Sequence, residues 1–296
     1  MARIALKIDV DTLRGTREGV PNLARMLDRA RARATFLFSL GPDHTGWALR
    51  RVFRPGFLKK VSRTSVVEHY GIKTLMYGVL LPGPDIGRRA ASQMRAIRDA
   101  GFECGIHTWD HVLWHDNVRE RDRDWTVEQM TASYRRYAEV FGAPPPTHGA
   151  AGWQMNPFAF EQIDTWGMRY ASDGRGHGPY RPCIDGEPLR HVQMPTTLPT
   201  FDEVIGADGI DETNIADHYL SLTASDRDHV FTLHAELEGQ KLAPSFERLL
   251  EGWRAQGHQL VAMADYHAAL DLKHVPLADI AWGEVPGRSG ELIIQP

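Results

Sequence analysis

The chain begins with the stretch RIALKIDVD (residues 3–11), in which a short apolar run leads directly to two aspartates, Asp9 and Asp11. A short apolar run that opens a chain in this way predicts a buried β-strand. Side chains at positions i and i+2 of a strand project to the same face, so both carboxylates can enter one cavity. The stretch therefore predicts a strand that ends at a functional site.

Outward from this strand, apolar runs alternate with amphipathic segments along the whole chain. The apolar runs predict strands at 3–9, 34–40, 102–106, 168–172, 191–195, 229–235 and 259–264. The amphipathic segments predict helices at 20–32, 85–100, 126–141, 156–166, 212–223 and 244–256, with Thr126 as the N-cap of the third. Regular alternation of this kind predicts a parallel sheet, either open and doubly wound or closed into a barrel.

Several common α/β signatures are missing from the sequence. There is no G-x-x-x-x-G-K-[ST] phosphate loop, residues 174–179 fail the G-x-G-x-x-G spacing, and no G-x-S-x-G nucleophile elbow occurs. We therefore favour a barrel, whose site lies at the carboxyl ends of its strands. Asp9, His107, Asp173 and His234 all fall at such ends.

Composition and charge narrow the class of protein. The 296 residues fit one large α/β domain or two ordinary ones, and the formal net charge of -4 excludes the basic footprint of a nucleic-acid-binding protein. Cys104 and Cys183 form no C-x-x-C motif, which favours a reducing compartment. Without a secretory signal or a long apolar segment, the expected location is cytoplasmic.

Residues 44–87 interrupt the alternation of strands and helices. Between Asp43 and Glu68 the sequence has no acidic residue, but it has a basic cluster and several large apolar side chains. This combination favours an insertion that lies on an anionic membrane surface through residues 47–82. A solvated loop with a local hydrophobic cluster is an equally good interpretation. The basic residues are Arg50, Arg51, Arg54, Lys59, Lys60 and Arg63.

His107 and His111 follow the predicted strand 102–106 at a spacing of four residues. Two imidazoles and one carboxylate commonly hold a divalent transition metal and leave positions open for water and substrate. Asp9 or Asp11 can supply the carboxylate, and the other aspartate can take a proton from water. A histidine pair by itself is weak evidence for a metal site, and two ordinary histidines without a metal remain the alternative. The nearby pair of aspartates makes a metal-dependent hydrolase the leading hypothesis.

Three blocks of the sequence resemble the polysaccharide deacetylase (NodB-homology) family, and the resemblance spans most of the chain. The blocks are residues 8–12, 107–111 and 232–234. The resemblance implies a single domain over 1–296, an irregular (β/α) barrel that carries the basic and apolar insertion near 44–87, and hydrolysis of an amide on a sugar. It also implies one divalent metal ion, which can be zinc, cobalt, nickel or manganese. The implied roles are Asp9 as general base, His234 as the acid that protonates the leaving amine, and three metal ligands, Asp11, His107 and His111.

Two departures from the family pattern bear on the site. Val10 separates two aspartates that are usually adjacent, and residues 144–153 lack the arginine that usually orients the base. Arg175, which follows Asp173, is the best replacement, with a loop arginine in water as the alternative. Trp153 could shape a sugar pocket or simply pack, and Glu236 could face the same cavity.

Further segments resemble one branch of the family, the bacterial deformylases of undecaprenyl-phosphate-linked 4-deoxy-4-formamido-L-arabinose. They are residues 14–21, 147–154, 171–173, 198–203 and 232–236. This branch implies a lipid-linked aminosugar substrate at the cytoplasmic face of the inner membrane, with a role in lipid A modification and resistance to cationic antimicrobial peptides. The alternatives are a deacetylase of an N-acetylated polysaccharide or peptidoglycan, and a non-catalytic protein that binds metal or lipid carrier. No protein partner is inferred.

Overall fold

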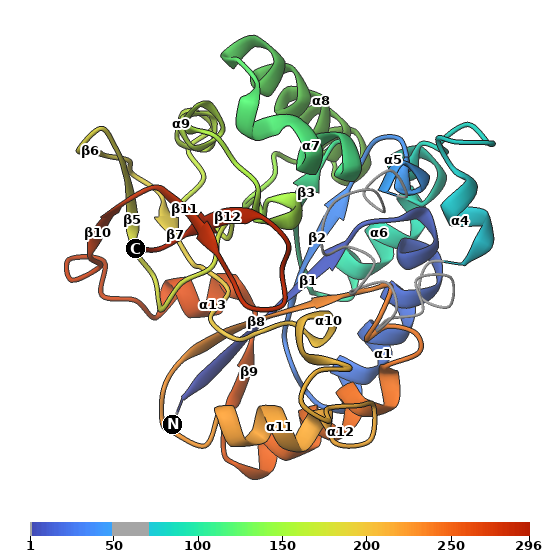
Figure 1. Ribbon diagram of the computed structural model, residues 1–296, viewed down its shortest axis with the longest axis vertical. Helices are drawn as coiled ribbons and strands as arrows, with labels where there is room; N and C mark the ends of the chain where they lie inside the picture. The colour runs from blue at the N-terminus through green and yellow to red at the C-terminus, as the bar shows by residue number, and fades with distance from the viewer. Residues whose placement is uncertain (1, 49–70) are drawn as a thin grey trace.

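Five parallel strands form the central sheet of the computed structural model, which describes residues 2–48 and 71–296 (Figure 1). The strand order is β3-β2-β1-β8, and β9 also pairs with β1. The strands are β1 (Arg3–Val10), β2 (Thr35–Ser39), β3 (Glu103–Thr108), β8 (His229–His234) and β9 (Gln259–Val261). Each matches a predicted strand, although the last is shorter than expected because α13 (Met263–Ala268) begins within the range 259–264.

Strand β1 lies at the centre of the sheet, and every residue from Ile4 to Val10 is buried. One edge of β1 pairs with β8, which places Asp9 directly opposite His234. The other edge is shared, because β9 pairs with Arg3–Ala5 and β2 pairs with the residues from Lys7 to Val10. Parallel pairing therefore brings the polar ends of β1 and β8 together at one edge of the sheet.

Short irregular segments close the sheet into a barrel. Beside β3, the amide of Ile106 donates to Thr147 and the amide of Gly149 donates to Ile106. The closure continues through β4 (Tyr170–Ala171) and β7 (Val192–Gln193), which pair in parallel. The amide of Thr197 then donates to Val230 in β8. This circuit confirms the irregular (β/α) barrel that the sequence predicted.

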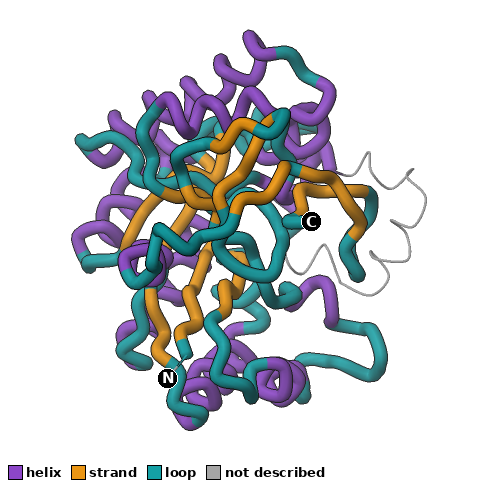
Figure 2. Tube along the Cα trace, turned by 90° about the vertical axis from the view of Figure 1, so that its left-hand side faces the viewer, coloured by secondary structure: helices purple, strands orange, loops and turns teal. Residues whose placement is uncertain are grey.

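Helices surround the strands, as the view in Figure 2 shows. The predicted helix at 85–100 is wrong as a single element, because Ala90 leaves helical geometry (φ -125°, ψ 17°) and separates α5 from α6. The predicted N-cap at Thr126 is also wrong. Asp122 accepts the amide hydrogen of Trp125 and is the N-cap of α8 (Arg123–Phe141), so this helix begins before Thr126. The predicted helices correspond to α1 (Val20–Arg29), α5 (Ile86–Arg89), α6 (Ala91–Asp99), α8 (Arg123–Phe141), α9 (Pro157–Thr165), α11 (Ile215–Leu222) and α12 (Ala243–Ala255).

The remaining elements are short and follow no periodic pattern in the sequence. Those nearest the site are the π-helix η1 (Gly15–Gly19), α7 (His111–Asn117), the 3-10 turn η4 (Ala151–Trp153) and α10 (Phe201–Val204). Strands β11 (Ala281–Glu284) and β12 (Glu291–Ile294) form a C-terminal hairpin, red in Figure 1. The others are η3 (Val118–Glu120), α4 (Ile72–Met76), β5 (Arg181–Ile184), β6 (Glu187–Pro188) and β10 (Leu277–Asp279).

The main core lies between the sheet and the helices that pack on it. Phe231 of β8 contacts Trp253 of α12 edge to face, at 5.3 Å between ring centroids. Phe201 packs against both Phe231 and Tyr219. Burial of these large aromatic rings between the sheet and the helices stabilises the position of the strands. The polar ends of the strands can then hold a fixed geometry.

The described part of the 44–87 segment folds back on itself. The amide of Gly46 donates to Tyr77, and the Trp47 indole donates to the carbonyl of Gly78 at 2.6 Å. The basic cluster from Arg50 to Arg63 lies outside the described residues. No helix within 2–48 and 71–296 combines the length and apolar character that crossing a bilayer requires.

Candidate metal centre and active site

The ends of β1 and β3, together with the first turn of α7, supply three side chains that could hold a metal ion. Asp11 directly follows β1, His107 lies in β3, and His111 is the first residue of α7. The helix starts there because the Asp110 carboxylate accepts the amide hydrogen of Leu113 at 3.1 Å, which is a standard N-cap. A local capping interaction thus turns His111 toward Asp11.

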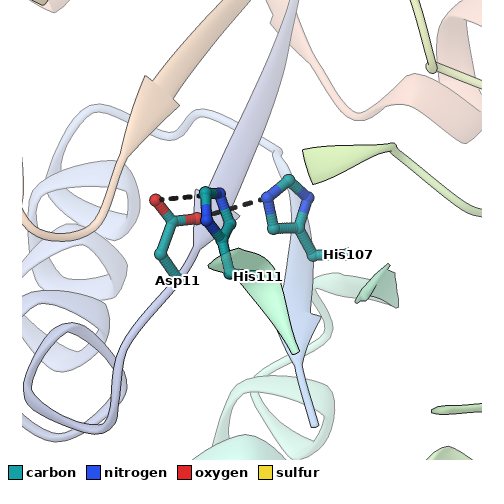
Figure 3. A group of neighbouring side chains, drawn as sticks. All are labelled: Asp11, His107 and His111. Atoms are coloured by element: carbon teal, nitrogen blue, oxygen red, sulfur yellow. Dashed lines mark ion pairs between the residues drawn. The ribbon is translucent and has the colours of Figure 1, made fainter. Parts of the chain in front are cut away.

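The three side chains meet around one point (Figure 3). His107 Nε2 lies 3.2 Å from Asp11 Oδ1, and His111 Nε2 lies 3.5 Å from Asp11 Oδ2. One ligand atom from each residue lies within 4.8 Å of the other two. The predicted ligand set of Asp11, His107 and His111 is therefore assembled in the fold.

The protonation pattern of this group suits a divalent transition metal. His107 Nδ1 donates to the carbonyl of Gly149 at 2.6 Å, which directs Nε2 at Asp11 and makes Nε2 the nitrogen that can bind a metal when the ring is neutral. Asp11 Oδ1 is buried and accepts no hydrogen bond within the described chain. Two imidazole nitrogens and one carboxylate are the donor set that such metals prefer. Burial alone raises the pKa of Asp11, but His111 and His107 outweigh it and hold that pKa below its usual range.

Asp9 lies beside the ligands without belonging to the triad. Its Oδ1 atom is 3.7 Å from His107 Nδ1 and accepts no hydrogen bond from any residue that the structure describes. Its Oδ2 atom is 3.4 Å from the ammonium of Lys7. A buried carboxylate with one unpartnered oxygen next to a metal site can accept a proton from water.

His234 reaches the same site from β8. It pairs in register with Asp9, and the amide of Ala235 donates to the carbonyl of Asp9 at 3.0 Å. The backbone amide of His234 donates to Glu238 Oε2 at 2.8 Å, which holds the end of the strand. His234 Nδ1 is buried and has no hydrogen-bond partner among residues 2–48 and 71–296. The structure therefore brings both predicted proton-transfer residues to the predicted ligands.

Glu236 supports the backbone around the metal ligand. Its Oε1 atom accepts hydrogen bonds from the amides of Asp11 and Thr12, at 3.1 and 2.9 Å, and from the Thr12 hydroxyl at 2.8 Å. Burial and the neighbouring Asp11 carboxylate raise the pKa of Glu236 well above its usual value. These contacts hold the backbone at Asp11 and Thr12.

Asp173 and Arg175 take part in different buried networks. Asp173 accepts hydrogen bonds from His148 Nδ1 and from the Gln193 amide, each at 2.7 Å. Burial raises the pKa of Asp173, but the neighbouring His148 outweighs it and lowers that pKa. Arg175 pairs with Glu203 at 2.5 Å and donates to the carbonyl of Leu198. Arg175 thus forms its ion pair with Glu203 of α10, whereas the ammonium of Lys7 lies 3.4 Å from Asp9.

Trp153 is a packed wall of the site. Only 2% of its surface is exposed, and its indole donates to the Thr196 hydroxyl at 3.2 Å. The side chains of Lys7, Arg175 and Arg288 lie 5.7, 4.9 and 4.6 Å from its ring centre. Cations within about 6 Å of an indole face are attracted to it. Trp153 therefore links the site to the C-terminal hairpin region.

The sequence analysis missed Lys7, His148 and Glu238 as parts of this site. Lys7 had a readable signal, because it is a charged residue inside an apolar strand, two positions before Asp9 and on the same face. His148 lay inside the 144–153 block, where an arginine was sought. Glu238 had no signal in the sequence, since only the turn after β8 brings it back to the amide of His234.

Comparisons with known proteins identify relatives of this chain. No family model matches the chain. A probable 4-deoxy-4-formamido-L-arabinose-phosphoundecaprenol deformylase ArnD of Shewanella sediminis is 36% identical over 294 residues, which cover 99% of this chain and 94% of that protein. The protein of the same name from Wigglesworthia glossinidia brevipalpis is 28% identical over 286 residues, covering 95% of this chain and 98% of the relative.

Solved structures show the same fold at low sequence identity. A putative polysaccharide deacetylase from Mycobacterium smegmatis superposes with a TM-score of 0.62 at 14% identity, covering 96% of each chain. A family 4 acetyl xylan esterase from Clostridium thermocellum, in complex with a cobalt ion, has a TM-score of 0.53 at 13% identity and 92% coverage of each chain. The fold is that of the polysaccharide deacetylases, and the chain belongs to the ArnD family of 4-deoxy-4-formamido-L-arabinose-phosphoundecaprenol deformylases.

Proposed function

We propose that this protein is a metal-dependent amidohydrolase that removes the formyl group from undecaprenyl-phosphate-linked 4-deoxy-4-formamido-L-arabinose. The observation that carries the proposal is the meeting of Asp11, His107 and His111 beside Asp9, whose Oδ1 atom is unpartnered. The 36% identity to an ArnD deformylase over 99% of the chain supports the substrate. The reaction would serve lipid A modification and resistance to cationic antimicrobial peptides.

The residues of this chain account for the two proton transfers that amide hydrolysis needs. Asp11, His107 and His111 would hold a divalent metal, which would supply Lewis acidity toward the formamide oxygen and toward water. Asp9 Oδ1 accepts a proton from water as the water oxygen bonds to the formyl carbon. His234 donates a proton to the sugar nitrogen as the carbon–nitrogen bond breaks. The products are formate and the 4-amino sugar, and both side chains return to their starting states by exchange with solvent.

The donor set accepts zinc, cobalt, nickel or manganese. We propose that one such ion occupies the triad, and a relative of the fold has been crystallised with cobalt. Metal analysis of the purified protein identifies the native ion. A His111→Ala variant, which removes one ligand, should lose the bound ion.

The proposed lipid-linked substrate requires contact with a membrane, which we assign to residues 47–82 at the cytoplasmic face of the inner membrane. Ile72, Val79 and Leu80 are 68%, 54% and 74% exposed. Their segment is joined to the metal site, because His44 contacts Asp110 at 2.5 Å and stacks on Trp47. Exposed apolar side chains of this kind insert into the interfacial region of a bilayer.

Vesicle binding tests this membrane contact. The double variant Val79→Ser/Leu80→Ser should bind vesicles that contain phosphatidylglycerol several-fold more weakly than the wild type, in a co-sedimentation assay. Leu277→Ser is the matched control, since Leu277 is 59% exposed in β10 and lies outside the assigned segment. Equal binding by all three proteins would contradict the assignment.

Mass spectrometry tests the activity itself. The purified protein is incubated with the formamido-arabinose lipid, with and without a chelator, and formate and the amino lipid are measured. We expect both products only in the metal-loaded sample. The N-acetyl analogue of the same lipid separates this proposal from the alternative deacetylase: release of acetate in preference to formate would overturn the assignment.

A further inference from the structure

Lys7 is a charged side chain inside the central strand β1, in which every residue from Ile4 to Val10 is buried. Its surface is 0% exposed, and its neighbours Leu6 and Ile8 are equally buried. Removing an ammonium from water is unfavourable unless a counter-charge and hydrogen-bond acceptors replace its hydration. The partners of Lys7 therefore indicate why a lysine is tolerated at this position.

Those partners belong to the active site. Lys7 Nζ lies 3.4 Å from Asp9 Oδ2 and donates to the carbonyl of Ser172 at 3.0 Å. The ammonium also lies 5.7 Å from the ring centre of Trp153. Residues i and i+2 of a strand share a face, so β1 itself places Lys7 beside Asp9.

The pairing distinguishes the two oxygens of Asp9. Oδ2 is held by Lys7, whereas Oδ1 faces the His107 ring and accepts no hydrogen bond from the described residues. The nearest His107 nitrogen, Nδ1, already donates to the carbonyl of Gly149. One oxygen is therefore fixed and the other is left for an incoming water molecule.

The stem of Lys7 is held as closely as its ammonium. A Cβ atom at Gly149 would lie 2.3 Å from Leu37 Cδ1 and 3.0 Å from Lys7 Cε. The absence of a side chain at Gly149 lets this segment pack directly against Lys7. The lysine rotamer is thus restricted by packing, which makes the position of Nζ precise.

We propose that Lys7 is the positioning residue for Asp9, holding the carboxylate by Oδ2 so that Oδ1 faces the water to be deprotonated. Lys7 fills the place for which Arg175 was the candidate from the sequence, since Arg175 pairs with Glu203. The inference rests on the proposed function, because Asp9 acts as a base only in that reaction.

A double-mutant cycle tests the proposal in the metal-loaded enzyme. Lys7→Met keeps the length of the stem and removes the charge, and it should lower kcat on the order of 10²-fold with little change in KM or metal content, because a misplaced catalytic group costs about that much. Lys7→Arg should restore most of the rate. In an Asp9→Asn background, Lys7→Met should change kcat by less than about threefold, since Lys7 acts through Asp9.

Arg3→Met is the matched control, because Arg3 lies on the same strand and pairs with Asp228 at 3.1 Å, away from the site. Its kcat should stay within about twofold of wild type. An equal loss from Lys7→Met with and without Asp9 would overturn the proposal, as would wild-type kcat in Lys7→Met.

Crystal structures provide a readout that needs no substrate. In Lys7→Met the Asp9 carboxylate should rotate away from its wild-type position, while Lys7→Arg should retain it. An unmoved carboxylate in Lys7→Met would refute positioning by Lys7. Absence of formate release from the wild type would instead refute the proposed function, so the two failures are distinguishable.

Discussion

The roles proposed for Asp9 and Asp11 differ although only Val10 separates the two residues. Asp11 meets two imidazoles, whereas Asp9 meets the ammonium of Lys7. The sequence predicts both carboxylates on one face of a strand, and their roles are implied by its resemblance to the polysaccharide deacetylase family. The structure adds the physical reason for the division, because different neighbours surround each carboxylate.

At Asp9 this division predicts a variant that binds metal but does not turn over. Asp9→Asn should retain its metal content, since Asp9 is outside the ligand triad, and lose on the order of 10²- to 10⁴-fold in kcat, because an amide cannot accept the proton. Metal analysis and formate release measure the two effects. Asp228→Asn, which alters an aspartate paired with Arg3, is the control and should retain activity. Near-wild-type turnover in Asp9→Asn would remove Asp9 from the role of base.

The raised pKa of Glu238 predicts that the free energy of unfolding depends on pH. Burial raises the pKa of Glu238 to about 8, whereas the carboxyl of an unfolded chain titrates near 4.5. Its stabilising contribution is therefore complete below pH about 4.5 and is lost as the pH rises toward 8, by up to about 1.4 kcal/mol per pH unit. Glu238→Gln stays neutral, so its free energy of unfolding should fall less steeply between pH 5 and 8. Urea unfolding of both proteins measures the slopes, and parallel slopes would contradict this assignment.

At the scale of elements, the site depends on turns rather than on the strands alone. The π-helix η1 begins at Gly15, which packs closely against the Glu236 carboxylate. The turn after β8 returns Glu236 to the amides of Asp11 and Thr12. The start of η1 and the turn after β8 come from distant parts of the chain and thus act together on Asp11, a proposed metal ligand.

The close approach of Gly15 to Glu236 predicts that a larger residue at position 15 weakens metal binding. A Cβ atom at position 15 would lie 1.9 Å from Glu236 Oε1, so Gly15→Ala should displace Glu236 and weaken metal binding about 10- to 100-fold. Metal titration of the apoprotein measures the affinity. Gly178→Ala is the matched control, because a Cβ there meets nothing within 4 Å. Unchanged affinity in Gly15→Ala would show that Glu236 does not support the ligand.

The larger elements were predictable because their signals are local. Apolar runs identified β1, β2, β3 and β8, and the helices predicted to end at 100, 141 and 256 end at Asp99, Phe141 and Ala255. The break at Ala90 was not predictable, because the amphipathic pattern continues through it. The segments that close the barrel were predicted as strands at 168–172 and 191–195, and the structure confirms them in shorter form, because β4 and β7 are only two residues long.

At the scale of the whole molecule, the metal should stabilise the fold. The proposed ligands lie just after β1, in β3 and in α7, so an ion bound to all three is bound only by the folded chain. Such binding should add about 2.7 kcal/mol to the free energy of unfolding when the free ion is at 100 times its Kd. Thermal unfolding with added metal and with chelator measures the shift in Tm. His111→Ala should show a much smaller shift, and an equal shift would place the stabilising ion elsewhere.

The sequence by itself determined the strand that begins the fold and the alternation that produces a barrel, because periodicity depends only on near neighbours. Its resemblance to the deacetylase family implied the five residues of the proposed chemistry. The tertiary structure decided that Lys7, and not Arg175, contacts Asp9, and that Glu236 supports Asp11. The contact between Glu236 and Asp11 joins residues 225 positions apart, so it arises from packing of the closed barrel rather than from any local pattern.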